Sequence, residues 1–253
     1  KPKNSVLDIS PYVPGKSDSD STKRVIKLSS NETPLGTSNK VLNVFKNFTL
    51  KPYRYPDGSA KNLREALAKK HSLDKDKIIC GNGSDEVLSL LANCFAGPGD
   101  EVIYSQHGFL VYPIAVKAAG AIPVVAPEKN LQADVEAIIK LSTNNTKLCY
   151  IANPNNPTGT YLSTKELVSL RHGLPEETIL VIDSAYAEYV EESDYSDGIN
   201  LVNQYNNIAC TRTFSKIYGL AALRIGWMYA SHDIIKYMNR VRLPFNTNSI
   251  AQI

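Results

Sequence analysis

The sequence contains no long hydrophobic run, and this absence argues against a membrane-spanning segment. The longest uncharged apolar stretches, such as VLSLLANCFAGPG at 87–99, are too short and too interrupted by Gly and Pro to cross a bilayer. Residues 1–10, KPKNSVLDIS, have neither a hydrophobic block nor a small-residue cleavage site, so they do not support secretion. We expect a cytoplasmic protein with no membrane span or anchor.

Cysteine is scarce and widely spaced. The four cysteines lie at positions 80, 94, 149 and 210, each beside apolar residues, with neither CxxC spacing nor a nearby histidine. This pattern predicts reduced cysteines in the core of a cytoplasmic protein. The alternative, a metal site, lacks the ligand spacing that such sites need, so we expect no metal.

Positive and negative charges are nearly balanced. Lysine and arginine total 28 against 25 acidic residues, the net charge is +3, and there is no long basic run. This balance gives no electrostatic reason to expect binding to nucleic acid or to an anionic membrane surface.

Short apolar runs alternate with segments of helical spacing from residue 61 onward. This alternation predicts an α/β domain with a mostly parallel central sheet flanked by helices. Several runs are apolar at successive positions, as expected for strands covered on both faces. The expected strands are 78–80, 101–105, 121–125, 147–152, 178–183, 207–211 and 225–230. The expected helices are 61–71, 85–95, 109–119, 134–141, 163–172 and 231–240.

Residues 1–60 are rich in Pro, Asn, Ser and Tyr and show little periodicity, which predicts an extended arm. At the other end, the sequence stops at SIAQI within a continuing pattern and without a helix stop signal. We therefore expect a chain that is incomplete at its C-terminus and, because no Met starts it, trimmed at its N-terminus.

An aspartate ends one of the expected strands. In TILVIDSAYAEY at 178–189, Asp183 closes the apolar run and Tyr186 follows three positions later. A buried carboxylate is costly unless a cation meets it, so Asp183 is a candidate partner for a bound cation. A helix N-cap or a turn residue is the alternative. Ligands bind at the carboxyl ends of parallel strands, and we expect the site there.

Two further loops also follow expected strands. In IANPNNPTGTY at 151–161, prolines can hold a side-chain amide rigidly, and Asn156 is the candidate. A plain strand-to-helix turn is the alternative. In CGNGSDEVLSLL at 80–91, Ser84 and Asp85 open a helix, whose free N–H groups can bind phosphate. The loop is neither a dinucleotide fingerprint nor a P-loop, and an ordinary capped helix explains it equally well.

The stretch TRTFSKIYGLAALRIG at 211–226 isolates one lysine, Lys216, in an almost uncharged run that ends at Arg224. A phosphate-bearing cofactor with a ring cation needs an anion cradle, a buried carboxylate, an amide donor and a lysine that can form a Schiff base. Pyridoxal phosphate meets this list. A surface lysine at a helix start is the alternative, but it leaves Thr213, Ser215 and Arg224 unexplained.

Eight motifs along the chain carry a resemblance to a known family. They are SSNETPLG (29–36), YRYPDG (53–58), GNGSDE (81–86), HGFLVY (107–112), NPNNPTG (153–159), VIDSAYAEY (181–189), TRTFSKIYGLAALRIG (211–226) and RLPFNTNSIAQ (242–252). Together they resemble the fold-type I pyridoxal phosphate aminotransferases of the aspartate aminotransferase type, and among these the histidinol-phosphate aminotransferase family. The resemblance covers nearly the whole chain.

The resemblance implies a role for each candidate residue. Lys216 would bind pyridoxal 5'-phosphate covalently and act as the general base, and Asp183 would pair with the pyridinium nitrogen. Tyr186 and Asn156 would hold the phenolic oxygen of the ring. The other implied contacts are ring stacking by Phe109 and phosphate binding by Ser84, Asp85, Thr213, Ser215 and Arg224.

The resemblance also implies a homodimer with a shared active site. In this family the tyrosine that matches Tyr55 reaches the cofactor phosphate of the neighbouring subunit. From the residues alone, Tyr55 reads as a surface or core aromatic in a turn. The implied division is 1–60 as an arm with small-domain and dimer contacts and 61–253 as the large cofactor-binding domain.

The implied activity moves an amino group between a small-molecule donor, glutamate, and a keto acceptor, imidazole acetol phosphate. The products are 2-oxoglutarate and histidinol phosphate, in histidine biosynthesis. An aromatic amino acid aminotransferase and a threonine-phosphate decarboxylase of the same fold stay open. A regulatory domain without activity is a further alternative, against which the intact Lys216, Asp183 and Tyr186 argue. The family's smaller C-terminal domain, with its substrate-binding arginines, would begin about where this sequence ends.

Overall fold

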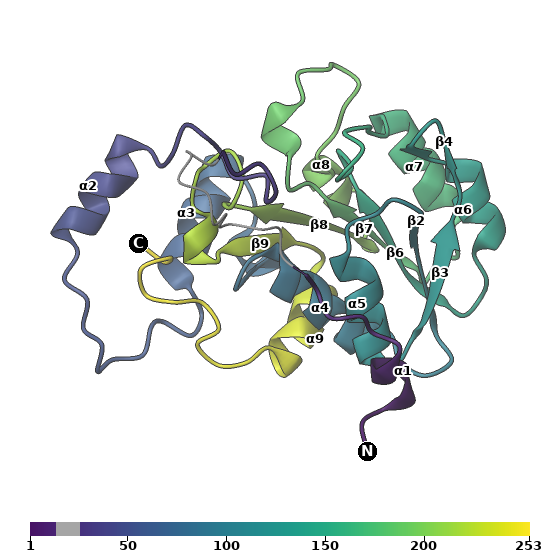
Figure 1. Cartoon of the computed structure of the whole chain (residues 1–253), viewed down its shortest axis with the longest axis horizontal. Coiled ribbons are helices and arrows are strands. Elements are labelled where there is room, and N and C mark those ends of the chain that lie inside the picture. The colour runs from purple at the N-terminus through teal and green to yellow at the C-terminus, as the bar shows by residue number, and fades with distance from the viewer. Residues whose placement is uncertain (14–25) are drawn as a thin grey trace.

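The central sheet is the core element of the fold. The computed structural model describes residues 1–13 and 26–253, and within them the sheet has seven strands in the order β1-β9-β8-β7-β6-β2-β3 (Figure 1). Each of the seven predicted apolar runs forms one of its strands. Their bounds are β1 Ile78–Gly81, β2 Glu101–Ser105, β3 Ile122–Ala126, β6 Thr146–Ala152, β7 Ile179–Asp183, β8 Ile208–Thr213 and β9 Gly226–Tyr229.

Five neighbouring strands of this sheet are parallel. β3, β2, β6, β7 and β8 pair in parallel, whereas β9 is antiparallel to both β8 and β1. A separate two-stranded hairpin consists of β4, Glu128–Lys129, and β5, Gln132–Ala133. The predicted α/β class with a mostly parallel sheet is therefore confirmed.

The predicted helices cover both faces of the sheet (Figure 1). They are α3 Lys61–His71, α4 Ser84–Phe95, α5 Val111–Ala119, α6 Val135–Leu141, α7 Thr164–Gly173 and α9 His232–Val241. Four of them, α4, α5, α6 and α7, lie between successive strands. The shorter elements are α1 Asn4–Leu7, α2 Asn39–Asn47, α8 Ile199–Val202 and the 3-10 turns η1 Lys75–Lys77, η2 Ala187–Tyr189 and η3 Ala221–Leu223. In the described residues no helix is both long and apolar enough to cross a membrane.

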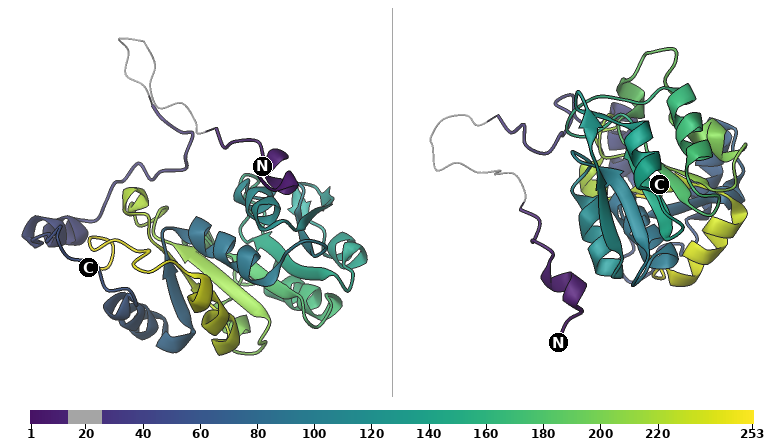
Figure 2. Two further views of the ribbon diagram at one scale, coloured as in Figure 1. Left: turned by 90° about the horizontal axis from the view of Figure 1, so that it is seen from below. Right: turned by 90° about the vertical axis from the view of Figure 1, so that its right-hand side faces the viewer.

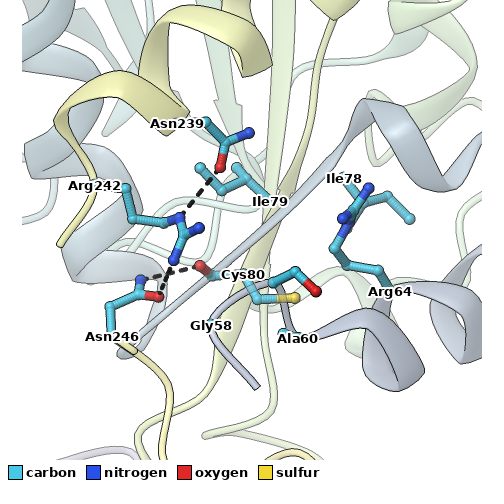
Figure 3. A pocket seen from close by; sticks show the side chains of 10 residues that line it. Gly58, Ala60, Arg64, Ile78, Ile79, Cys80, Asn239, Arg242 and Asn246 are labelled. Atoms are coloured by element: carbon cyan, nitrogen blue, oxygen red, sulfur yellow. Dashed lines mark hydrogen bonds between the residues drawn. The ribbon is translucent and has the colours of Figure 1, made fainter. Parts of the chain in front are cut away.

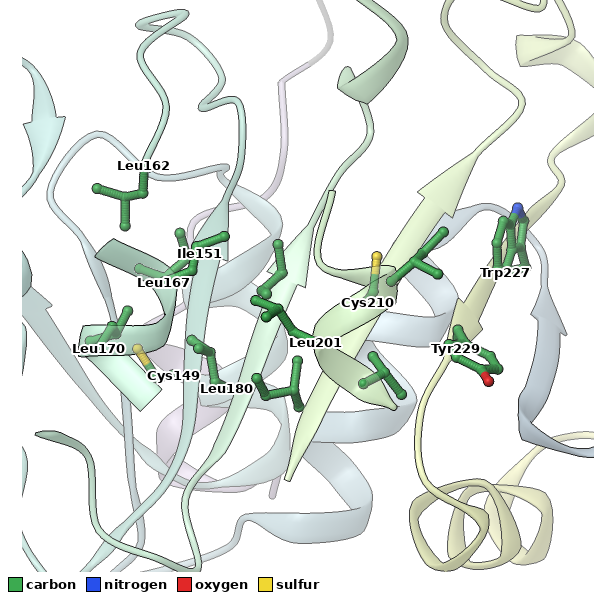
Figure 4. Packing of buried hydrophobic residues seen from close by; sticks show 14 of the residues in the cluster. Cys149, Ile151, Leu162, Leu167, Leu170, Leu180, Leu201, Cys210, Trp227 and Tyr229 are labelled. Carbon is green, nitrogen blue, oxygen red and sulfur yellow. The ribbon is translucent and has the colours of Figure 1, made fainter. Parts of the chain in front are cut away.

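Two hydrophobic clusters fill the space between the sheet and its helices. Adjacent residues of a strand point to opposite faces, so Val181 of β7 joins the cluster beneath α4, α5 and α9, while Leu180 and Ile182 join the other. Figure 4 shows this second cluster, in which Leu180 lies near Leu201 of α8. Helices on both faces explain why the strands read as continuous apolar runs.

The cysteines belong to this core, as predicted. Cys80, Cys149 and Cys210 are buried, Cys94 is partly buried, and all four are free thiols. Burial raises the pKa of the Cys80 thiol to about 12 and that of Cys149 likewise, which keeps both uncharged. Across residues 1–13 and 26–253, no group of three or more His, Cys, Asp or Glu residues could hold a metal ion.

The N-terminal segments lie largely outside the layered part of the fold. Helix α2 has no buried residue, and Figure 2 shows it beside the sheet rather than on either of its faces. The segment from residue 26 to 37 instead returns to the sheet edge, where the Thr37 hydroxyl donates to the Gly219 carbonyl at 2.7 Å.

The topology brings several strand ends and loops to one edge of the sheet. In the parallel strands, Asp183 lies opposite Ala152 of β6 and Thr211 of β8. Because β9 runs the other way, its first residue, Gly226, lies at the same edge, opposite both Thr213 and Gly81. The start of α4 is thereby placed beside the end of β8.

Candidate active site

A pocket of about 700 Å³ opens at this edge. Such a volume is typical of sites for small ligands. Ten of the eleven residues predicted from the sequence line it: Ser84, Asp85, Phe109, Asn156, Asp183, Tyr186, Thr213, Ser215, Lys216 and Arg224. Residues 29–32 of the N-terminal segment and His107 also line it. The pocket therefore collects side chains from segments far apart in the sequence.

Asp183 lies at the floor of the pocket and is only 4% exposed. One carboxylate oxygen accepts a hydrogen bond from the Thr211 hydroxyl at 2.8 Å, and the other accepts one from the Tyr112 hydroxyl at 2.9 Å. Burial raises the pKa of Asp183 to about 6, and the two hydrogen bonds partly oppose that rise. The turn that follows, η2, has Tyr186 at its N-cap position, so Asp183 does not cap it.

The two hydroxyl donors to Asp183 were not predicted. Thr211 could have been found from the period of two along β8, because it shares a face with the predicted Thr213. Tyr112 is fully buried in α5 and stacks on Tyr150 of β6 with ring centroids 5.0 Å apart. HGFLVY contains Tyr112, but no local pattern indicates that its hydroxyl meets a residue 71 positions away.

Lys216 lies between the N-terminal segment and Tyr186. Its Nζ donates to the Ser30 carbonyl at 3.1 Å and lies 5.5 Å from the centroid of the Tyr186 ring. Asn31 Nδ2 donates to the Tyr186 hydroxyl at 2.7 Å. Residues 30 and 31 thus orient both the lysine and the tyrosine, a contact across 155 positions or more that the sequence pattern does not reveal.

The cationic end of the pocket is built around Arg224. Its guanidinium donates to the Ser215 hydroxyl at 3.3 Å and pairs with the Asp85 carboxylate at 3.0 Å. The Thr213 and Ser215 hydroxyls are 3.0 Å apart. Gly83, with a φ of 84°, precedes α4, and a Cβ there would overlap the Arg224 guanidinium. Glycine therefore allows the arginine and the helix N-terminus to approach each other.

This arrangement favours an anion at the α4 end of the pocket. The first N–H groups of a helix have no intrahelical acceptor, and the helix dipole adds positive potential there. Gly226 brings β9 against the same turn, since a Cβ at this position would overlap the backbone N of Ser84. The amides of α4, the hydroxyls of Thr213 and Ser215, and Arg224 together can hold a phosphate group.

The asparagine-rich loop divides its amides between two tasks. Asn153 bonds both the N–H and the carbonyl of Leu162, and Asn155 donates to the His107 carbonyl at 3.1 Å. These two side chains hold the loop itself. Asn156 lines the pocket instead, as does Phe109, whose ring packs edge-on against Tyr112. The loop is therefore more than a turn, because one amide faces the ligand space.

Tyr55 lies outside this pocket. Its side chain is 81% exposed and stacks on Phe245, with ring centroids 4.5 Å apart and an interplanar angle of 13°. It makes no contribution to the pocket of its own chain. This position is compatible with the predicted contact to a second subunit.

The donor set fits pyridoxal phosphate. Within the described residues, the Asp183 carboxylate accepts hydrogen bonds only from two neutral hydroxyls, which leaves a buried negative charge for a ring cation to meet. Arg224 and the α4 N-terminus provide for a phosphate, and the Lys216 amine lines the same pocket. Each part of the cofactor thus has a residue of suitable chemistry.

Comparisons with known proteins agree with this assignment. The family model for class I and II aminotransferases matches residues 23–253. A histidinol-phosphate aminotransferase of Rhodopseudomonas palustris (strain HaA2) is 53% identical over 253 residues, which is 100% of this chain and 69% of that protein.

Solved structures give the same result at the level of the fold. The histidinol-phosphate aminotransferase from Sinorhizobium meliloti, in complex with pyridoxal-5'-phosphate, superposes with a TM-score of 0.83 at 28% identity, over 88% of this chain and 61% of that one. The L-threonine-O-3-phosphate decarboxylase from Porphyromonas gingivalis superposes with a TM-score of 0.68 at 27% identity, over 79% of this chain and 58% of that one. The chain thus spans between about three fifths and seven tenths of these proteins.

The raised pKa of Asp183 predicts a pH-dependent stability in the cofactor-free protein. Between its usual value of 3.8 and about 6, the folded state binds the carboxyl proton more tightly than the unfolded state. The free energy of unfolding should therefore fall as the pH rises through this window and level off above it. Asp183→Asn removes this loss, so the variant should be more stable at pH 7 by up to ~3 kcal/mol, with a smaller difference near pH 4.

Urea unfolding of both cofactor-free proteins between pH 4 and 7 measures this difference. If Asp183→Asn is less stable than the unaltered protein at pH 7, the claim that the buried Asp183 charge destabilises the cofactor-free protein is wrong.

Proposed function

The chain belongs to the histidinol-phosphate aminotransferases of the class I and II aminotransferase family, and on this premise we propose that its pocket exchanges an amino group between glutamate and imidazole acetol phosphate. The products are 2-oxoglutarate and histidinol phosphate, a step of histidine biosynthesis. The observation that carries the proposal is the placement of Lys216, Asp183 and Arg224 in one pocket of a chain 53% identical to such an enzyme.

The bound cofactor supplies an electron-accepting ring and a carbonyl group that takes up the amine. Asp183 keeps a proton on the ring nitrogen, because a buried carboxylate stabilises a cation beside it. Tyr186, oriented by Asn31, and Asn156 donate hydrogen bonds to the ring oxygen. Phe109 stacks on the ring and fixes its plane.

Lys216 has two tasks in this proposal. Its Nζ would hold the cofactor through a covalent bond. As the general base, the free Lys216 amine would hold and move the proton that leaves the substrate α carbon. The phosphate contacts of Ser84, Asp85, Thr213, Ser215 and Arg224 hold the other end of the cofactor, so that this proton is transferred at a fixed position.

We also infer a cytoplasmic location and the division of the chain at residue 60. Four free cysteines, three of them buried, support the reducing compartment. The layered sheet and its helices begin with α3 at Lys61, which supports residues 61–253 as the large cofactor-binding domain. Residues 1–60 then supply the N-terminal arm and contacts to a second subunit.

The activity is tested with the purified full-length protein, glutamate and imidazole acetol phosphate. Turnover should produce histidinol phosphate and 2-oxoglutarate, and Lys216→Ala should abolish it because the variant lacks both the covalent anchor and the base. Lys236→Ala, an exposed lysine on α9, is the matched control and should stay active. Retained activity in Lys216→Ala would overturn the assignment, whereas preference for phenylalanine, or release of carbon dioxide, would replace the substrate proposal with one of its alternatives.

The shared active site is tested by subunit mixing. Tyr55→Phe keeps the ring that stacks on Phe245, so the protein should stay folded. It removes the hydroxyl proposed to bind the cofactor phosphate of the second subunit, so cofactor binding should weaken. Mixed with Lys216→Ala under conditions of subunit exchange, it should form heterodimers in which one site has both Tyr55 and Lys216. Activity should rise above that of either parent, and no rise despite demonstrated exchange would exclude the shared site.

A further inference from the structure

A hydrogen-bonded cluster lies beside the end of β1, and none of the residues around its cavity lines the Lys216 pocket. Figure 3 shows Arg242 and Asn246 reaching from the segment after α9 toward the backbone of Cys80. The cavity next to this cluster measures only about 50 Å³, which leaves room for little more than water. The cluster is therefore not a ligand site, and its contacts need another explanation.

Asn246 joins the end of β1 to the beginning of α4. Its Nδ2 donates to the Cys80 carbonyl at 3.1 Å and to Glu86 Oε2 at 2.8 Å. The same Glu86 oxygen accepts the backbone N–H of Asn82 at 2.5 Å. The Asn246 amide therefore contacts β1 directly, at the Cys80 carbonyl. It contacts the loop after β1 indirectly, because the Glu86 carboxylate that it bonds also accepts the N–H of Asn82.

The orientation of this amide is set by Arg242. Its Nη1 donates to Asn246 Oδ1 at 2.9 Å, while its Nε donates to Asn239 Oδ1 at 3.2 Å. A guanidinium only donates, so it selects the oxygen side of the Asn246 amide and leaves the nitrogen for Cys80 and Glu86.

The residues between the two anchors, Cys80 and Glu86, include Ser84 and Asp85, which are proposed to hold the cofactor phosphate. They also include Gly81 and Gly83, which leave the loop backbone free to adopt other conformations unless it is held. Glu86 lies in the first turn of α4, and its carboxylate accepts hydrogen bonds from Asn82 and Asn246, so it is not an anion ligand. Its observed contacts instead tether the loop.

We propose that Asn246 and Glu86 are positioning residues that hold the β1–α4 loop, and hence the Ser84 and Asp85 amides, in place to bind the phosphate of the cofactor. This inference rests on the proposed function. Neither side chain lines the pocket, so both act through the loop.

The test compares two ligands that differ only in the phosphate. The cofactor-free full-length protein is titrated with pyridoxal phosphate and with pyridoxal, and thermal unfolding is recorded in parallel. Asn246→Ala should weaken pyridoxal phosphate binding about tenfold, equivalent to ~1.4 kcal/mol, and leave pyridoxal binding unchanged. Glu86→Ala should give the same selective loss, and the double variant should lose little more than either single variant, because both belong to one tether.

Two variants serve as controls. Glu86→Gln keeps an oxygen that can accept both hydrogen bonds, so it should restore most of the preference for pyridoxal phosphate; it also serves if an alanine variant does not fold. Asn203→Ala removes an amide oxygen that accepts a hydrogen bond from the Tyr229 hydroxyl at 2.8 Å, at the end of β9 far from the loop. It should change the affinity for neither pyridoxal phosphate nor pyridoxal.

The outcomes separate this inference from the function on which it rests. If Asn246→Ala weakens both ligands equally, or neither, the positioning role is wrong. If Glu86→Gln behaves like Glu86→Ala, or tightens phosphate binding, charge rather than the tether controls the loop. If the unaltered protein binds pyridoxal as tightly as pyridoxal phosphate, the proposed phosphate site itself fails.

Discussion

The burial of one carboxylate governs the rest of the active site. Asp183 ends a central strand whose neighbours cover it on both sides, so its charge is almost completely removed from water. In the described residues its hydrogen-bond partners are the hydroxyls of Thr211 and Tyr112, which offer dipoles but no charge. The folded protein therefore stores an unfavourable interaction that a bound ring cation would relieve. This is the reason to connect the fold with pyridoxal phosphate chemistry.

The antiparallel strand β9 sets the second constraint. It begins at the edge at which the parallel strands end, and so its first residue, Gly226, and the preceding Arg224 lie against the start of α4. The cationic end of the pocket thus lies beside the sheet, and Lys216 lies in the connection between β8 and β9. Strand pairing fixes Asp183 at the end of β7 and Gly226, two residues after Arg224, at the start of β9.

The sequence predicted most of the fold because the sheet is covered on both faces. Its strands are short apolar runs, and one that ends in a carboxylate, as β7 does at Asp183, is unusual enough to indicate a site. Tyr112 could not be assigned from the sequence, because its contact depends on the packing of α5, whereas Thr211 shares a face of β8 with the predicted Thr213. Asn31 is further from prediction, since it meets Tyr186 across 155 positions from a segment without periodicity.

The central claim is that Lys216 binds the cofactor covalently in the pocket floored by Asp183. The most direct measurement is borohydride reduction of the full-length protein loaded with pyridoxal phosphate, followed by digestion and mass spectrometry of the peptides. The account predicts a phosphopyridoxyl group on the peptide that carries Lys216, at the Nζ atom and in about one copy per chain. A label on a different lysine, or none on a protein that has bound the cofactor, would contradict it.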